Sequence, residues 1–337
     1  MLDLDFFWGW EMGLQLRHGN VGFLYSQLFV EPKYPTDLFT NQVIIVTGSN
    51  VGLGYEAARH FVRLNAARVI LAVRNVEAGH KAKKAVKQST GRHGVCEVWE
   101  VDLASCDSVR AFSARASQLP RLDVLMANAG IATTRFTTAE EHEHSITVNV
   151  INTFLLAFLL VPVLKRTEET YPDATPHLSV VTSEVHAWTD LPEWKTENTF
   201  KTLDDETKAD MNMRYPTTKL LQILVSRELA SRLEGSGVVV NMLQPGMCHS
   251  ELTREDGWMT AVLKLILARS TEVGSRTLVA AASAGIEAHG AYMRDGEIDN
   301  EALSPFVRSD DGEIAQKKVW EELIRILENA YPGATAF

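Results

Sequence analysis

The chain has 337 residues, of which 45% are hydrophobic and 23% charged, and a formal net charge of −10. This length permits one α/β domain with added segments at its ends, and the composition excludes a disordered or fibrous protein. The acidic balance, with no Lys/Arg-rich block, argues against a nucleic-acid partner, because phosphate backbones bind to basic faces. A local basic pocket for one small phosphate is still compatible with it.

The cysteines and the N-terminal stretch bear on location. Cys96, Cys106 and Cys248 are widely spaced and odd in number, so we expect no disulfide framework, no metal cluster, and an intracellular, cytoplasmic protein.

The N-terminus lacks the basic start and cleavage site of a secretory signal, and its apolar pieces are too short to span a bilayer. The aromatic residues within 6–10 could lie on a membrane surface or pack on the protein's own body, and both interpretations stay open.

Short β-branched runs alternate with helical patterns along the chain. The predicted strands cover residues 42–47, 68–73, 96–101, 122–126, 177–182 and 238–243. Helical patterns cover residues 55–64, 76–88, 107–118 and 311–329, the last with Ile314, Val319, Leu323 and Leu327 on one packed face. This alternation predicts an α/β fold with a doubly wound parallel sheet of the Rossmann type and helices on both of its faces.

Residues 148–164 are apolar enough to resemble a membrane helix. Asn149, Asn152 and Pro162 interrupt this stretch, and it is shorter than the ~20 residues that a span requires, so we expect a helix buried against the sheet. No Pro/Gly/Ser-rich linker divides the chain. We therefore expect an N-terminal extension (1–39), a nucleotide-binding domain with the catalytic residues (40–255), and a lid and helical region of the same domain (256–337).

A glycine-rich turn, TGSNVGLG at residues 47–54, joins the first strand to the next helix. Gly48, Gly52 and Gly54 stand where the backbone must approach a pyrophosphate closely, although their spacing differs from the general dinucleotide fingerprint. The alternative is a turn without a ligand. The second strand is followed by Arg74 and not by an acidic residue. Because an Arg there accommodates a ribose 2′-phosphate, we predict NADP(H), with a solvated surface charge as the alternative for Arg74.

Tyr215 and Lys219 are four residues apart in a helical pattern, so both side chains share one face. A phenol is a poor acid or base at neutral pH, and a nearby ammonium would lower its pKa toward the working range. Ser183, at the end of the fifth predicted strand, is suited to bind a substrate oxygen on which charge develops. A Tyr and a Lys at this spacing are common on helix surfaces, and the glycine-rich turn is what makes the pair significant.

Together these motifs resemble the short-chain dehydrogenases/reductases over roughly residues 40–255. The resemblance also includes Asp102 in VDL, Asn128 in NAG, Asn149 in TVNV, and Pro245 in QPGMCHSEL. Within that superfamily the chain is most similar to the retinol-dehydrogenase-like and WW-domain-oxidoreductase-like group, especially to fungal members that act in secondary metabolism. Family members often form homodimers through the helices that carry Asn149 and Tyr215, which the added segments here could block.

The resemblance implies a role for each matching residue. Asp102 would contact the adenine, and Asn128 would lie beside the cofactor and steady the central strands. Asn149 would hold a water in a proton relay with Lys219, which also binds the nicotinamide ribose. Without the resemblance, Asn149 would be a satisfied buried residue and Asp102 a turn or helix cap. The implied cofactor-binding set is Gly48, Asn50, Gly52, Leu53, Gly54, Arg74, Asp102, Asn128, Tyr215, Lys219, Pro245, Gly246, Cys248 and Ser250.

The segment between Ser183 and Tyr215 is longer than is usual in the family. Its residues His186, Trp188, Trp194 and Phe200 could stack on a ring-bearing substrate or pack the segment down, and both remain open. No nucleophile elbow surrounds Ser183, which excludes a Ser/His hydrolase with His186. In the segment after Pro245 and Gly246, which usually acts as a lid, His249 and Trp258 have either a lid or a surface role.

We expect an enzyme that interconverts a ketone or aldehyde and an alcohol on a moderately large apolar substrate. Ser183, Tyr215, Lys219 and Asn149 are its predicted catalytic residues. Two alternatives are an isomerase, dehydratase or cyclase that retains the cofactor site, and a scaffold protein. Degenerate catalytic positions would indicate a scaffold, and the sequence has none.

Overall fold

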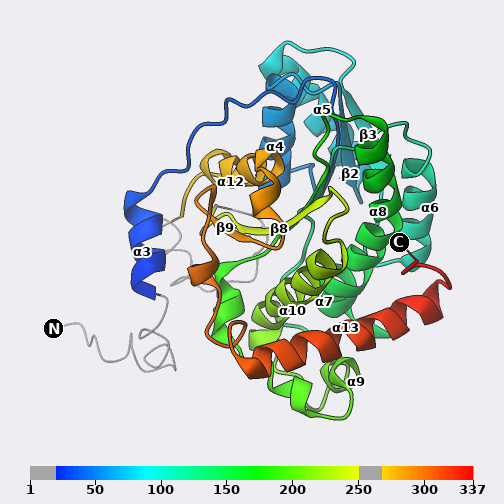
Figure 1. Cartoon of the computed structure of the whole chain (residues 1–337), viewed down its shortest axis with the longest axis vertical. Coiled ribbons are helices and arrows are strands. Elements are labelled where there is room, and N and C mark those ends of the chain that lie inside the picture. The colour runs from blue at the N-terminus through cyan, green and yellow to red at the C-terminus, as the bar shows by residue number, and fades with distance from the viewer. Residues whose placement is uncertain (1–19, 250–267, 337) are drawn as a thin grey trace.

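The computed structural model describes residues 20–249 and 268–336. Within these residues, the centre is an eight-stranded sheet in the order β10-β9-β8-β7-β4-β1-β2-β3, parallel except for β10 (Figure 1). Its strands are β1 (Val43–Thr47), β2 (Arg68–Val73), β3 (Cys96–Glu100), β4 (Val124–Ala127), β7 (His177–Val181), β8 (Val239–Gln244), β9 (Tyr292–Arg294) and β10 (Glu297–Ile298). A separate two-stranded ribbon pairs β5 (Thr138–Ala139) with β6 (His142–Glu143).

The six strands predicted from the sequence are confirmed, each to within two residues. The short strands β9 and β10 were not predicted, because three or two residues are too few to show a periodic pattern. β1, β7 and β8 are buried along their whole length, as expected for central strands of a sheet that is covered on both faces.

Two layers of helices enclose the sheet, and the strands divide their side chains between two cores. On one side, α4 (Gly52–Arg63), α5 (Val76–Thr90) and α12 (Thr271–Ser283) pack against residues such as Ile44 and Val46. On the other side, α6 (Cys106–Ala116), α8 (Asn152–Thr170) and α10 (Met211–Arg232) pack against residues such as Val43 and Ile45. The doubly wound Rossmann fold is therefore confirmed, and it places the carboxyl ends of the parallel strands at one edge.

The apolar segment around α8 is the one helical stretch of the described residues with the length and hydropathy of a membrane span. It runs over His144–Thr170; its most apolar 18-residue window has a mean hydropathy of 2.1, and 89% of that window is buried inside the protein. This burial confirms the prediction of a core helix. The stretch opens with α7 (His144–Ile146) and a π-helical turn, η1 (Thr147–Ile151), which carries Asn149.

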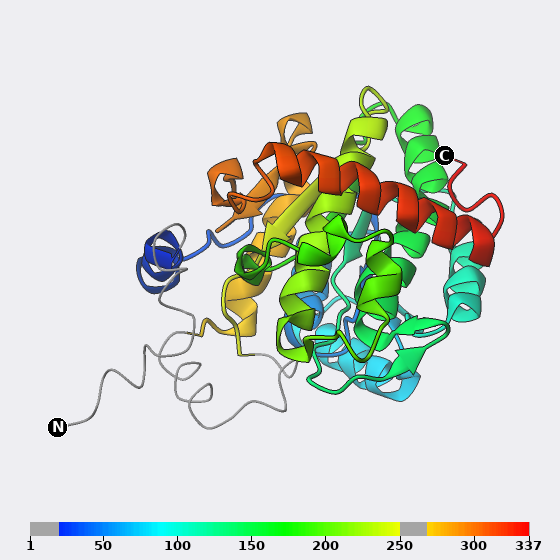
Figure 2. The ribbon, with the colours of Figure 1, turned by 90° about the horizontal axis from the view of Figure 1, so that it is seen from below.

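The C-terminal helix α13 (Asp310–Ala330) crosses the outer faces of α8 and α10 (Figure 2). The Trp320 ring lies 5.3 Å from the ring of Phe158 on α8, and the Arg232 guanidinium from α10 lies 4.9 Å from the Trp320 centroid. A homodimer through the outer faces of α8 and α10 would have to displace this helix. Placing Ile314 on the packed face was wrong, because it is 55% exposed; the contact begins one residue later, at the buried Ala315.

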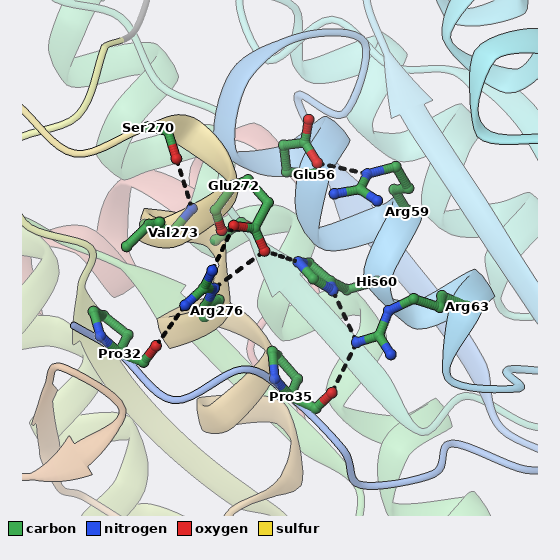
Figure 3. A network of polar contacts seen from close by, with 12 residues as sticks. Pro32, Pro35, Glu56, Arg59, His60, Arg63, Ser270, Glu272, Val273 and Arg276 are labelled. Atoms are coloured by element: carbon green, nitrogen blue, oxygen red, sulfur yellow. Dashed lines mark hydrogen bonds and ion pairs between the residues drawn. The ribbon is translucent and has the colours of Figure 1, made fainter. Parts of the chain in front are cut away.

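The segment that follows α3 (Asn20–Phe29) is tied to α4 and α12 by a polar network (Figure 3). Arg276 of α12 donates to Glu31 and to the carbonyl of Pro32, and it also pairs with Glu272. Glu272 accepts a hydrogen bond from the fully buried His60 of α4, at 2.9 Å. Burial lowers the pKa of His60 to about 4, so the ring is neutral at neutral pH. The network holds α4, whose first turn forms part of the candidate site.

Candidate active site

A cavity of about 570 Å³ runs along the carboxyl ends of the parallel strands. Pockets for small molecules and cofactors typically measure about 300–1,000 Å³, and in sheets of this topology they lie at this edge. One end of the cavity is lined by Arg74 and Asp102, and the other by Ser183, Tyr215 and Cys248. We call these the adenine end and the catalytic end, after the roles that the sequence predicts for their residues.

The glycine-rich turn forms the floor between the two ends. Gly48 and Gly52 have φ values of 65° and 64°, which side-chain-bearing residues rarely adopt. A Cβ on Gly54 would lie 2.5 Å from Asn128 Nδ2, whereas one on Gly52 would meet nothing within 4 Å. The first residue before α4, Val51, gives the helix no side-chain cap, so its first N–H groups have no such partner. Gly52 and Leu53 of this first turn line the cavity, and uncapped amides at a helix N-terminus fit a pyrophosphate.

The end of β1 is locked to the end of β4 next to this turn. Thr47 Oγ1 accepts hydrogen bonds from the N–H groups of Asn128 and Ala129, at 3.0 and 2.9 Å. Asn128 Nδ2 in turn donates to the main-chain oxygen of Thr47 at 2.8 Å. The cavity floor is therefore rigid where two neighbouring strands end.

At the adenine end the polar side chains reach solvent. Arg74 is exposed, and within the described residues it has no hydrogen bond or ion pair, so its guanidinium is available to a phosphate. Asn75 caps α5 by accepting from the Ala78 N–H at 2.9 Å. Asp102 lines the cavity and also caps a turn, because its Oδ1 accepts from the Ala104 N–H at 2.9 Å. The capping role and a contact with a ligand are thus compatible for Asp102.

At the catalytic end three side chains converge from two elements. Ser183 follows β7 and precedes the 3₁₀ helix η2 (Glu184–Trp188), and its Oγ accepts from the Val185 N–H at 3.4 Å. That leaves the hydroxyl proton for the hydrogen bond between Ser183 and Tyr215. Tyr215 and Lys219 lie one turn apart on α10, with Lys219 Nζ 5.5 Å from the centre of the Tyr215 ring. Asp210 caps this helix through the Asn212 and Met213 N–H groups.

Burial changes the pKa of both groups on α10. It raises the pKa of Tyr215 above its ordinary value, while the hydrogen bond with Ser183 acts in the opposite direction. Burial also lowers the pKa of Lys219 to about 7, so its charge is titrated near neutral pH. The sequence predicted an effect of the Lys219 ammonium on Tyr215; in the folded protein desolvation is the largest effect on the pKa of Tyr215.

Asn149 is fully buried in η1, and its side chain is completely engaged. Its Oδ1 accepts from the Ile131 N–H at 2.8 Å, and its Nδ2 donates to the Ile131 oxygen at 2.8 Å and to Thr218 Oγ1 at 3.1 Å. Its main-chain oxygen faces α10, where it accepts a hydrogen bond from Gln222. A π-turn inside a helical segment often marks a functional position, and here it presents a carbonyl to the catalytic helix.

Comparisons with known proteins decide the family. A family model described as short chain dehydrogenase matches residues 42–170. The short-chain dehydrogenase anuD of Penicillium roqueforti is 50% identical over 323 residues, covering 93% of this chain and 84% of that protein. The short chain dehydrogenase/reductase dmxR8 of a Cryptosporiopsis species is 45% identical over 328 residues, covering 94% and 99%. The chain belongs to the short-chain dehydrogenase family.

A solved structure shares the fold of this short-chain dehydrogenase. The NADPH-bound carbonyl reductase from chicken fatty liver matches with a TM-score of 0.59 at 18% identity, covering 77% of this chain and 99% of that one. At this identity the match bears on the fold alone.

In this short-chain dehydrogenase most of the predicted site residues lie on the cavity wall. The exceptions are Gly54 and Asn149, which lie just behind it, and Ser250, which is outside the described residues. Pro245, Gly246 and Cys248 line the catalytic end. Their roles toward a cofactor remain predictions.

Three residues of the dehydrogenase site were missed. Thr47 joins the ends of β1 and β4 through its hydrogen bonds with Asn128 and Ala129. Gln222 accepts a hydrogen bond from Lys219. Gln27 of α3 pairs with both main-chain groups of Met247, at 2.8 and 3.0 Å, and so holds the loop beside Gly246. Thr47 belongs to the glycine-rich turn found in the sequence, although no role was predicted for it. Gln222 also had a signal, since it follows Lys219 by three residues on the same helical face, whereas Gln27 had none.

The long segment of the dehydrogenase before Tyr215 is mainly packed down. It contains η3 (Pro192–Lys195) and the short helix α9 (Thr199–Leu203). Phe200 and His186 are buried, and Trp194 packs on the same core, whereas Trp188 is 43% exposed. For three of the four rings the packing interpretation is therefore the right one. His249 is exposed, and Trp258 lies outside the described residues.

Proposed function

We propose that this short-chain dehydrogenase uses NADP(H) to interconvert a ketone or aldehyde and an alcohol on a moderately large apolar substrate. The observation that carries the proposal is the convergence of Ser183, Tyr215 and Lys219 at one end of a cavity whose other end has a glycine-rich turn and a free arginine. Hydride transfer is the chemistry that a bound nicotinamide supplies.

The chain's own residues handle the proton. In reduction, Tyr215 donates its phenolic proton to the substrate oxygen; in oxidation, the phenolate of Tyr215 takes the proton of the alcohol. Ser183 binds the same oxygen and orients it. The ammonium of Lys219, 5.5 Å from the ring of Tyr215, favours the phenolate and thereby opposes the effect of burial.

Arg74 supports a preference for NADP(H) over NAD(H). It lines the cavity at the end of β2, and no acid of the described residues neutralises it. A 2′-phosphate placed there would gain charge-assisted hydrogen bonds, and an unphosphorylated ribose would not.

The proposed substrate class follows from the walls of the cavity and from the relatives. Ile131, Ala132 and Val148 are among the apolar residues that line the cavity, and they favour an apolar molecule. Two fungal relatives at 45–50% identity span nearly the whole chain, and we propose that the substrate is an intermediate of fungal secondary metabolism.

Parallel fluorescence titrations with NADPH and NADH test the cofactor, followed by NADPH turnover with a panel of apolar ketones and aldehydes. We expect tight NADPH binding, weaker NADH binding, and turnover of at least one carbonyl compound. Tyr215→Phe serves as the control, since it should bind NADPH but not turn over. Absence of binding to either nucleotide would refute the proposal, and a preference for NADH would refute the role of Arg74.

A further inference from the structure

Lys219 and Asn149 are connected by one buried side chain that the mechanism above does not use. Lys219 Nζ donates to Gln222 Oε1 at 2.9 Å, and Gln222 Nε2 donates to the main-chain oxygen of Asn149 at 2.7 Å. Lys219 and Gln222 are 3% and 1% exposed. We propose that Gln222 is a positioning residue that holds the Lys219 amine beside Tyr215 and favours its ammonium form.

The direction of the Gln222 amide is determined by its surroundings. A carboxamide has a donor end and an acceptor end, and the Asn149 oxygen can bind only the donor end. The acceptor oxygen must then point at Lys219. Asn149 is itself held through its side chain by Ile131 and Thr218, so the orientation of Gln222 rests on a fixed support.

Few other groups stabilise the charge of Lys219. Its second acceptor is the main-chain oxygen of Val181, at 2.9 Å, and burial alone lowers the pKa of Lys219. The titratable groups of η2, which packs on α10, are Glu184 and His186. Burial raises the pKa of Glu184 to about 7 and lowers that of His186 to about 4, and neither group acts on Lys219.

In the described part of the chain, the ammonium therefore depends on two carbonyl oxygens, one of which belongs to Gln222. A hydrogen bond accepted from the charged form favours that form and is stronger than one between neutral groups. Removing the Gln222 oxygen should lower the pKa of Lys219 further, by roughly one to two units. Less ammonium at neutral pH would in turn disfavour the phenolate of Tyr215.

The first test measures Lys219 without cofactor or substrate. Because the pKa of Lys219 is lower in the folded than in the unfolded chain, its contribution makes the free energy of unfolding rise with pH from about pH 7 toward the ordinary lysine range. To isolate that contribution, Lys219→Met is made in the parent and in each Gln222 variant. Its free energy of unfolding is then subtracted at every pH from that of the protein that retains Lys219. In Gln222→Leu, the Lys219 contribution to the free energy of unfolding should begin to rise at lower pH. In Gln222→Glu, which places a carboxylate against the ammonium, it should begin to rise at higher pH.

The second test rests on the proposed function and uses alcohol oxidation. Oxidation requires the phenolate of Tyr215, so the rate of oxidation should rise with pH. In Gln222→Leu this rise in rate should occur at higher pH than in the parent. Ser226→Ala is the matched control, because Ser226 is buried one turn further along α10 and its hydroxyl has no partner among the described residues. It should leave both pH dependences unchanged.

The two tests separate the possible outcomes. If Gln222 only packs the helix, the Lys219 contribution obtained by the subtraction would rise over the same pH range in the parent and in both variants, and that result would overturn the proposal. Opposite shifts in Gln222→Leu and Gln222→Glu support it even where no oxidation is detected, since the unfolding measurement is independent of the cofactor. If Gln222→Leu does not fold, an unchanged pH dependence in Gln222→Glu is sufficient to reject the proposal.

Discussion

At the adenine end of the cavity, Arg74 is exposed and stands directly after a strand, whereas at the catalytic end Lys219 is buried and bonded to groups from β7 and its own helix. The adenine end is built from segments that follow one another along the first three strands. The catalytic end brings together η1, the end of β7, α10 and the loop after β8, and the N-terminal helix α3 holds that loop through Gln27.

This difference separates two kinds of contribution. An exposed side chain can change what binds with little effect on stability, because solvent replaces its lost contacts. A buried polar group changes its own pKa, its neighbours' pKa values and the free energy of unfolding together. Substitutions at the catalytic end should therefore alter chemistry and pH dependence, and those at the adenine end should alter the choice of nucleotide.

The largest effect is expected at the catalytic end, from Tyr215→Phe. Without the phenolic proton, kcat should fall about 10³-fold, within the range of general acid/base catalysis, while NADPH affinity stays close to that of the parent. Steady-state kinetics measure kcat, and a fluorescence titration measures the affinity for NADPH. The exposed Tyr25→Phe is the control. Retention of most of the kcat in Tyr215→Phe would remove this residue from the proton transfer.

Gly54→Ala tests the floor between the ends and should have the next largest effect. The added methyl group would lie 2.5 Å from Asn128 Nδ2 and 2.7 Å from the Gly48 oxygen, so the turn must shift. We expect a loss of about 1–3 kcal/mol in the free energy of unfolding, typical of overpacking, and strongly weakened binding of either nucleotide. Gly91→Ala adds the same methyl group at the end of α5, where nothing lies within 4 Å, and should leave nucleotide binding intact.

Arg74→Ala should affect NADPH binding alone. Loss of a charged hydrogen-bonding partner predicts roughly 10- to 100-fold weaker binding of NADPH and no change for NADH or for thermal stability. Because Arg74 is exposed, added salt should weaken NADPH binding in the parent more than in the variant. Lys84→Ala on α5 controls for the general loss of a positive charge. Equal weakening for both nucleotides would contradict a 2′-phosphate contact.

The smallest effect on function is expected for Glu184, next to Ser183, because the predicted change concerns stability alone. Burial raises its pKa to about 7, so the folded protein keeps a proton that the unfolded chain loses. The free energy of unfolding should therefore fall as the pH rises from about 4.5 to about 7. Glu184→Gln should remove this fall and add on the order of 1–3 kcal/mol at neutral pH. Chemical denaturation at several pH values measures it, and identical curves for the two proteins would contradict it.

How far the sequence predicts the molecule differs between the same two regions. The glycine-rich turn and the six long strands were predictable, because each depends on spacing within a short stretch. The short strands β9 and β10 and the packing of Phe200 were not, since they depend on segments that are far apart in the chain. The same is true of Ile314, whose apolar character suggested burial but which lies beyond the contact with α8 and α10.

The sequence by itself determined the α/β architecture, the position of the dinucleotide turn and the shared helical face of Tyr215 and Lys219, because periodic patterns and local spacing encode them. Only the tertiary structure decided the electrostatics of the catalytic end. Burial, which raises the pKa of Tyr215 and lowers that of Lys219, and the support from Gln222 and Asn149 arise when distant segments exclude water from the same place. Desolvation depends on that exclusion, and no local pattern in the chain encodes it.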